Sequence, residues 1–268
     1  MINFTTTARA GAFAISALLG ASIYTTAADA ALVTLNPSLS TPALSAQGAF
    51  NTDNATIADN ATVVFDAAGN FTETGFFRIT SFNIGGDAQT SGVTSTYNIY
   101  GTFTATGTGG VLGTVQTLTF TLFGDPGANN TFPVTGTGIT GTGDDITLGT
   151  GSLIPGAGNV AIVLPPFSNP TGLTLNADTT FIPDPAQLAF FVAPVPFNIN
   201  LQIAANVTNE ASSSDCGATL QSCTITINGG GGNISFVTAV PEPATLGILG
   251  TGLLGLGAAW RRRRARAA

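Results

Sequence analysis

Apolar and polar residues alternate in short stretches along the middle of the chain. In residues 117–122, leucine and phenylalanine occupy every second position, and threonine occupies the positions between them. Because successive side chains of a β-strand point to opposite faces, this pattern predicts a strand that buries Leu118, Phe120 and Leu122 and exposes its threonines. The stretch from Phe197 to Ile203 alternates in the same way, with Asn and Gln on the polar face.

Stretches of this kind are separated by clusters of Gly, Pro, Asn and Asp, and the chain between its two ends shows no helical periodicity. Ten or more strands predict an all-β fold, with a body that is an antiparallel β-sandwich or jelly roll. The glycine tract 229–232 is predicted to be a flexible hairpin turn. The clearest predicted strands are Phe71–Phe82, Thr94–Thr106, Val115–Phe123, Asp145–Leu153, Asn159–Leu164, Leu173–Phe181, Leu188–Ala193, Phe197–Val207, Cys223–Ile227 and Ile234–Thr238.

The first 30 residues have the organisation of a secretory signal peptide. Arg9 precedes the apolar run Ala10–Ile23, which is followed by small residues that end in Ala28-Asp29-Ala30. This order predicts a signal-peptide helix, export by the secretion machinery, and cleavage by signal peptidase after Ala30, with Ala28 and Ala30 as the small residues of the site. The alternative is an N-terminal membrane anchor, but the apolar run is shorter than the roughly 20 residues that a spanning helix needs. Residues 31–239 are then the secreted body.

The C-terminal segment 240–268 combines three features in a fixed order. The motif Pro241-Glu242-Pro243 precedes an apolar run, 244–260, which predicts a transmembrane helix about 25 Å long at 1.5 Å per residue. A basic stop, 261–266, follows and would keep that end of the helix on the cytoplasmic side of the membrane. Its arginines are Arg261, Arg262, Arg263, Arg264 and Arg266.

This segment resembles the PEP-CTERM sorting signal of Gram-negative bacteria that make exopolysaccharide. The resemblance implies that an exosortase recognises Pro241, Glu242 and Pro243 and removes the helix. The inner membrane would then hold the precursor only transiently. The product would reach the outer cell surface or the extracellular matrix.

The middle of the chain resembles the flocculation-associated subgroup of PEP-CTERM proteins. The resemblance implies a role in floc or biofilm formation, in which cells are held together with exopolysaccharide as the partner. The matching stretches are Tyr97–Phe103, Asp125-Pro126, Asn129–Phe132, Gly143–Ile146, Phe191–Pro194 and Pro196-Phe197.

Charge narrows the possible partners. Residues 31–243 contain thirteen of the 14 acidic residues but only one of the 7 arginines, Arg78, so this part carries a net charge of about −12. Nucleic-acid binding depends mainly on Lys and Arg, and we therefore expect no nucleic-acid partner. Neutral glycans and divalent cations are better matched. The outward Thr and Asn side chains leave a carbohydrate-binding module as an alternative function.

The composition also removes most catalytic chemistry. The chain contains no His and no Lys, which excludes Ser-His-Asp, Cys-His and lysine-based mechanisms. We expect no enzyme activity and no cofactor. A carboxylate-dependent glycosidase remains a weaker alternative, because it needs only two Asp or Glu residues beside a cleft. The available carboxylates, none in a recognisable catalytic motif, are Asp53, Asp59, Asp66, Glu73, Asp87, Asp144, Asp145, Asp178, Asp184, Glu210 and Asp215.

Two short motifs have specific chemistry. Cys216 and Cys223 are the only cysteines and, in an exported chain, predict a structural disulfide; the alternative is a pair of free thiols. Asp144-Asp145 could bind Ca²⁺ with the help of Asp125, since hard cations prefer oxygen ligands. The alternative is a solvated turn, for which adjacent Asp residues are common. We therefore assign no metal from the sequence.

Overall fold

The computed structural model describes residues 30–109, 112–163, 172–195, 197–206, 211–214, 216 and 220–238. Residues 1–29 of the predicted signal peptide and the whole of 240–268, with its predicted transmembrane helix, lie outside these ranges. Within the described ranges, no helix has the length and apolar character needed to cross a membrane.

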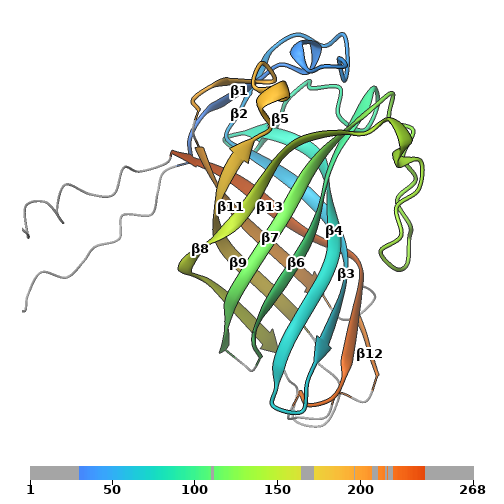
Figure 1. Cartoon of the computed structure of the whole chain (residues 1–268), viewed down its shortest axis with the longest axis vertical. Coiled ribbons are helices and arrows are strands. Elements are labelled where there is room, and N and C mark those ends of the chain that lie inside the picture. Colours follow the sequence, from blue (N-terminus) through green and yellow to red (C-terminus); the bar gives the residue numbers. More distant parts are fainter. Residues whose placement is uncertain are drawn as a thin grey trace, which may run out of the picture.

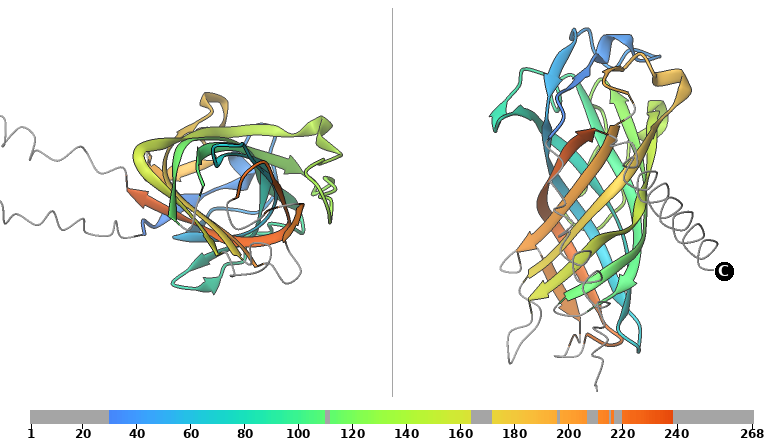
Figure 2. Two further views of the ribbon diagram at one scale, coloured as in Figure 1. Left: turned by 90° about the horizontal axis from the view of Figure 1, so that it is seen from below. Right: turned by 90° about the vertical axis from the view of Figure 1, so that its left-hand side faces the viewer.

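Eight long antiparallel strands form a closed barrel (Figures 1 and 2). Each strand pairs with the next of the eight along the chain, and the last of them, β13, also pairs with the first, β3. The left view of Figure 2 shows the strands around the barrel axis. The strands are β3 (Asn54–Phe65), β4 (Asn70–Ile84), β6 (Tyr97–Thr108), β7 (Leu112–Pro126), β8 (Ile146–Val163), β9 (Gly172–Pro183), β11 (Phe197–Asn206) and β13 (Thr224–Thr238).

The register of the pairs shows how the barrel closes. A path of directly paired residues that starts at Thr226 on β13 passes once around the barrel and returns to β13 at Val237, eleven positions further along, since 237 minus 226 is 11. Such a shift requires strands that are tilted relative to the barrel axis. The path contains Thr226, Thr62, Thr74, Thr104, Thr119, Ser152, Thr180, Asn198 and Val237.

The all-β prediction is confirmed, but the predicted sandwich or jelly roll is wrong. A jelly roll needs connections that pass between two sheets, whereas here each connection joins neighbouring strands of one sheet. Some of the predicted strands were also too short, whereas Leu188–Ala193 was too long, because only Phe191–Ala193 of it is a strand. Asp145–Leu153 and Asn159–Leu164 belong to the single strand β8, which has a register shift between Leu153 and Gly158. Strands of this length can wrap around a barrel.

The glycine tract 229–232 is not a turn but the middle of β13. A register shift between Asn228 and Gly230 accommodates it in the pairing with β3. A Cβ atom at Gly230 would overlap the Asp59 carboxylate, and one at Gly232 would overlap the backbone of Gln202. Gly230 and Gly232 are therefore required because the Asp59 side chain and the Gln202 backbone approach them closely.

The predicted alternation places the apolar side chains inside the barrel. Leu118, Phe120 and Leu122 are buried, as expected. The ring of Phe120 lies 5.9 Å from that of Phe77 and 6.2 Å from that of Phe181, and a Cβ atom at Gly151 would overlap it. A cavity that Phe77 and Phe120 line together with other core residues is about 20 Å³, room for roughly one water molecule. This part of the interior is a packed core.

A small three-stranded sheet closes one end of the barrel (Figure 1, top). Gln187 ties the cap together, since its amide nitrogen donates to the Thr41 carbonyl at 2.7 Å and its amide oxygen accepts from the Thr41 nitrogen at 2.9 Å. The cap strands are β1 (Val33–Leu35), β2 (Phe50–Thr52) and β10 (Phe191–Ala193), and the remaining elements are β5 (Asp87–Ala88), β12 (Ala211–Ser214) and the 3₁₀ helices η1 (Pro37–Leu39), η2 (Thr142–Asp144) and η3 (Pro185–Gln187).

One carboxyl group inside the barrel is unusual. Glu73 on β4 is 1% exposed, and neither of its carboxyl oxygens has a hydrogen-bond partner among the described residues. Burial raises the pKa of Glu73 to about 7, because an ionised carboxylate is poorly solvated there.

This pKa predicts that the barrel loses stability as the pH rises. The contribution of protonated Glu73 is complete below its ordinary pKa of 4.5 and is lost as pH rises through about 7. The difference corresponds to about 3 kcal/mol. Urea unfolding from pH 4.5 to pH 8 should show this fall in the native protein, and Glu73→Gln should remove most of it. Parallel losses in both proteins would contradict the assignment.

Candidate functional site

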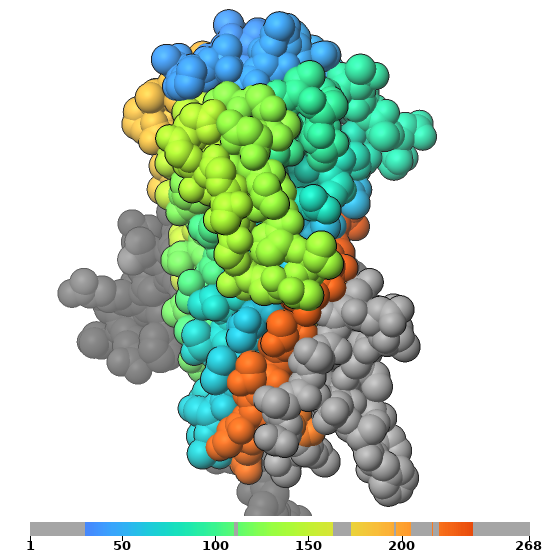
Figure 3. All heavy atoms as spheres, turned by 90° about the vertical axis from the view of Figure 1, so that its right-hand side faces the viewer, coloured from blue at the N-terminus to red at the C-terminus, as the bar shows by residue number. Residues whose placement is uncertain are grey.

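A long loop, residues 127–145, joins β7 to β8 and folds over the outside of the barrel (Figure 3, yellow-green). Phe132 anchors it, with its ring 5.7 Å from that of Phe76 and 5.5 Å from that of Tyr100. The Arg78 guanidinium lies 5.5 Å from the centre of the Phe132 ring, a cation–π contact. The only cationic side chain of the described residues is therefore used to hold this loop.

Asparagine side chains hold the same loop from the neighbouring strands. The amide nitrogen of Asn60, a residue that is 4% exposed, donates to the carbonyl oxygens of Pro133 at 3.0 Å and Gly136 at 2.9 Å. The Gly136 nitrogen donates to the Asn228 side chain at 2.9 Å. Together with Phe132, these bonds place the loop across β6, β4, β3 and β13. Loops of this length are uncommon unless they are functional.

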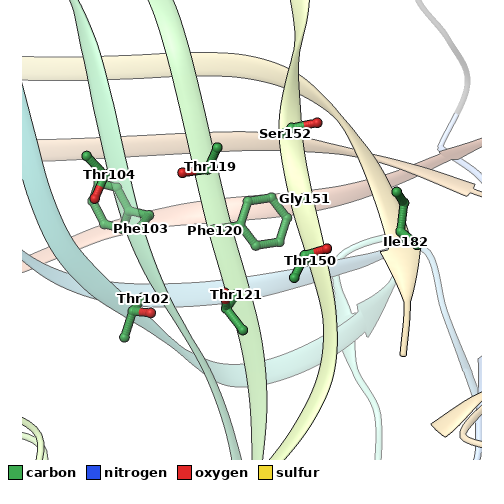
Figure 4. A pocket seen from close by; sticks show the side chains of 10 residues that line it. All are labelled: Thr102, Phe103, Thr104, Thr119, Phe120, Thr121, Thr150, Gly151, Ser152 and Ile182. Carbon is green, nitrogen blue, oxygen red and sulfur yellow. The ribbon is translucent and has the colours of Figure 1, made fainter. Parts of the chain in front are cut away.

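Beside the loop, the outer surface carries a regular set of hydroxyl groups that we call the hydroxyl face (Figure 4). Its residues line a recess of about 400 Å³, and no charged residue lines it. The hydroxyl face consists of Thr102 and Thr104 on β6, Thr119 and Thr121 on β7, and Thr150 and Ser152 on β8.

These six residues form two rows across three strands. Thr104 pairs with Thr119, which pairs with Ser152, and the second row is formed in the same way by the other three residues. Neighbouring strands lie about 4.8 Å apart and the rows about 6.8 Å apart. Among the described residues, the hydroxyls of Thr104 and Thr119 make no hydrogen bond, so they are available to a ligand.

A second recess, also about 400 Å³, lies between the hydroxyl face and the loop. Thr102 lines both recesses, so they are adjacent. The rings of Tyr100 and Phe123 stack here with their centres 5.2 Å apart. Asp145 lines the same recess. The combined surface thus has aromatic rings and a carboxylate at one end and hydroxyl groups at the other.

The base of the loop brings three carboxylates together. Asp125 at the end of β7 and Asp144 and Asp145 before β8 each place an oxygen within 4.8 Å of the others. The Tyr100 hydroxyl donates to Asp145. Desolvation is the largest influence that raises the pKa of Asp145, and the charges of Asp125 and Asp144 act in the same direction. The sequence singled out these three residues, and the structure confirms that they meet.

Sequence reasoning did not identify the neutral residues around this cluster. Tyr100, Asn129 and Asn130 all hydrogen-bond to its carboxylates. The only signal for them in the sequence was the predicted resemblance of Tyr97–Phe103 and Asn129–Phe132 to flocculation-associated proteins, which the comparisons below do not confirm. The other carboxylates considered for a glycosidase do not join this group. Of the described residues, only these three acids form a cluster of three or more.

The predicted disulfide between Cys216 and Cys223 is present. It lies at the barrel end away from the cap, where the Cys223 carbonyl accepts from the Phe65 nitrogen. Glu210 and Asp215 lie outside the described residues, as do Ala28 of the signal peptidase site, the motif Pro241–Pro243 and the C-terminal arginines.

Residues 239–264 match the PEP-CTERM protein-sorting motif. This match confirms the predicted sorting signal and implies an exported, membrane-anchored precursor that an exosortase then processes. It covers about a tenth of the 268-residue chain and none of the barrel. No curated protein and no solved structure is significantly similar to the chain.

Loss of the disulfide should lower the stability of the barrel. Replacing both Cys216 and Cys223 by serine removes a cross-link between residues seven positions apart. The entropy of so short a loop corresponds to about 2 to 3 kcal/mol in the free energy of unfolding. Urea unfolding of the double variant measures the loss, and reduced native protein should show a similar value. An unchanged free energy of unfolding would show that the bond does not support the fold.

Proposed function

We propose that this chain is a non-enzymatic protein of the cell surface or extracellular matrix that binds neutral polysaccharide through its hydroxyl face and so promotes floc or biofilm formation. The observation that carries this proposal is the uncharged double row of hydroxyls next to stacked aromatic rings on an exported chain.

The chemistry of this surface matches that of a glycan. Threonine hydroxyls both donate and accept hydrogen bonds, as sugar hydroxyls do. Their regular spacing along and across the strands suits a polymer that repeats the same groups. Tyr100 and Phe123 add aromatic surface at one end, which sugars can contact through their C–H groups. The strongly acidic body disfavours anionic polymers, so the proposed ligand is a neutral polysaccharide.

A binding role is favoured over catalysis by the state of the clustered carboxylates. Asp125 is fully buried and accepts hydrogen bonds from the Asn98 side chain at 2.7 Å and the Asn130 nitrogen at 2.9 Å. A glycosidase needs two carboxyl groups that reach the sugar; Asp125 does not reach the surface, and the Asp145 carboxylate already accepts from the Tyr100 hydroxyl and the Asn130 amide, which leaves Asp144 without a second free carboxyl group. The chain has no His or Lys to replace it.

The proposal of a role in floc formation is also supported by the location of the resembling stretches. Tyr97–Phe103 supplies Tyr100 and Thr102 of the adjoining recesses, and Asn129–Phe132 and Gly143–Ile146 belong to the loop and its base. Cells that lack this protein should therefore flocculate poorly. Normal flocculation with unchanged exopolysaccharide would contradict this role.

The double variant Thr104→Val/Thr119→Val tests the hydroxyl face directly. Valine keeps the shape and strand preference of threonine but cannot hydrogen-bond. If each hydroxyl makes one bond to the glycan, the association constant should fall by roughly 5- to 150-fold in total, since such bonds contribute about 0.5–1.5 kcal/mol each. Isothermal titration calorimetry with dextran, cello-oligosaccharides and the neutral exopolysaccharide fraction measures the change.

The matched control is Thr62→Val/Thr226→Val. These threonines also face outward on paired strands, β3 and β13, but do not line the recess. This variant should bind as the native protein does. Equal affinities for all three proteins would rule out the hydroxyl face as the binding surface.

Processing at the sorting signal predicts a shortened product. Mass spectrometry of the native protein from cells and medium should find no residues after Pro243, because the exosortase removes the helix. Replacing Pro241, Glu242 and Pro243 by alanine should leave the C-terminal segment attached and keep the protein in the membrane fraction. Removal of the segment from this variant would show that the motif does not direct cleavage.

A further inference from the structure

The base of the loop 127–145 has features of a cation site that do not depend on glycan binding. Three carboxylates with oxygens within 4.8 Å of one another repel each other strongly. The only cationic side chain of the described residues, Arg78, lies over the Phe132 ring. The carboxylates are held instead by neutral donors, which include the Asn129 amide at 3.1 and 3.2 Å from the oxygens of Asp144.

Asn130 provides a second and independent observation. This residue is only 9% exposed, and its side chain points into the cluster, with the amide nitrogen 3.1 Å from both carboxylate oxygens of Asp145. Its side-chain oxygen is buried and has no hydrogen-bond partner. An asparagine oxygen left in this way normally has a partner, because burial without one costs about 1–3 kcal/mol.

A bound cation would satisfy this oxygen. The nitrogen and oxygen of an asparagine amide have nearly the same shape, so a half-turn of the Asn130 amide would direct the oxygen toward Asp145. Two oxygens that face each other repel unless a cation lies between them. The same cation would offset the charges of Asp125, Asp144 and Asp145.

We propose that Asp125, Asp144, Asp145 and the side-chain oxygen of Asn130 form a calcium site that fastens the base of the loop. All four ligands are hard oxygen donors, which favours Ca²⁺ or Mg²⁺ over transition metals. Three of them come from the loop, and only Asp125 belongs to a strand; such a flexible set favours the larger and more adaptable Ca²⁺. The ion joins the end of β7 to the start of β8, so its effect is to hold the loop against the barrel.

Terbium luminescence can test this site because of its tyrosine. Tb³⁺ occupies calcium sites and emits when a nearby aromatic ring is excited, and Tyr100 contacts Asp145 directly. The processed protein contains Tyr97 and Tyr100 and lacks Trp260. Added Tb³⁺ should therefore emit under tyrosine excitation, and Ca²⁺ should displace it with a stronger effect than Mg²⁺.

Three variants separate this site from general attraction to an acidic surface. Asp144→Asn/Asp145→Asn should weaken Ca²⁺ binding, measured by calorimetry with Ca²⁺ alone, by at least about tenfold, because ligand charge sets affinity. Tyr100→Phe should retain Ca²⁺ binding but lose most of the Tb³⁺ emission excited through tyrosine, because phenylalanine absorbs at shorter wavelength and the tyrosine nearest Asp145 is gone. Asp87→Asn, a change at an exposed carboxylate on β5, should leave both readouts unchanged.

A structural readout keeps the test decisive if a variant folds poorly. Ca²⁺ should slow proteolysis of the native protein within residues 127–143 and raise its melting temperature. The proposal is overturned if calorimetry shows no Ca²⁺ binding to the native protein, or if the Asp144→Asn/Asp145→Asn variant and the Asp87→Asn variant lose affinity equally. Loss of glycan binding with Ca²⁺ binding intact would contradict only the proposed function.

Discussion

The closed register of the barrel is the constraint on which the other features depend. Because β13 pairs with both β3 and β11, a slip of one residue in any strand would have to be compensated around the whole ring. Such a slip would also turn the apolar side chains of that strand outward. The register therefore fixes two surfaces together, the phenylalanine-rich interior and the threonine-rich exterior. The rows of the hydroxyl face are a direct result, since residues such as Thr104 and Thr119 are brought opposite each other by pairing.

Because the interior is packed, the recesses large enough for a ligand lie on the outside of the barrel. The cavity that Phe77 and Phe120 line in the core is too small for an organic ligand. The cap closes the barrel above this core. Larger recesses lie on the exterior, beside the loop between β7 and β8. That loop brings asparagine, aromatic and carboxylate groups next to the hydroxyl face.

Alternation in the sequence was enough to predict which residues of a strand are buried, but not how the strands pair. The two faces of the strand around Phe120 were assigned correctly. Strand β3 was not predicted, because Asp59 occupies one of its inward positions and small alanines occupy others, which weakens the alternation. The glycines at 229–232 have the composition of a turn, and only the structure explains them: Asp59 and the Gln202 backbone approach Gly230 and Gly232 closely, and Gly229 has a positive φ of 75°. Barrel and sandwich share the same local patterns, and long-range register distinguishes them.

From the sequence, only the part of the candidate site whose residues are adjacent in the chain could be predicted. Asp144 and Asp145 are adjacent in sequence, so their pairing needs no tertiary information. The approach of Tyr100 and Asn130 depends on how the loop folds back over β6, which in turn depends on Phe132 between Phe76 and Tyr100. The position of Arg78 determines which groups of the loop have a cationic partner. Because the one cation of the described barrel stabilises the aromatic contact, the carboxylates at the other end of the loop have no protein cation to pair with. The aromatic contacts of Phe132 are thus stabilised by a side chain of the described barrel, Arg78. The carboxylate cluster at the base of the loop has no such counter-charge among the described residues.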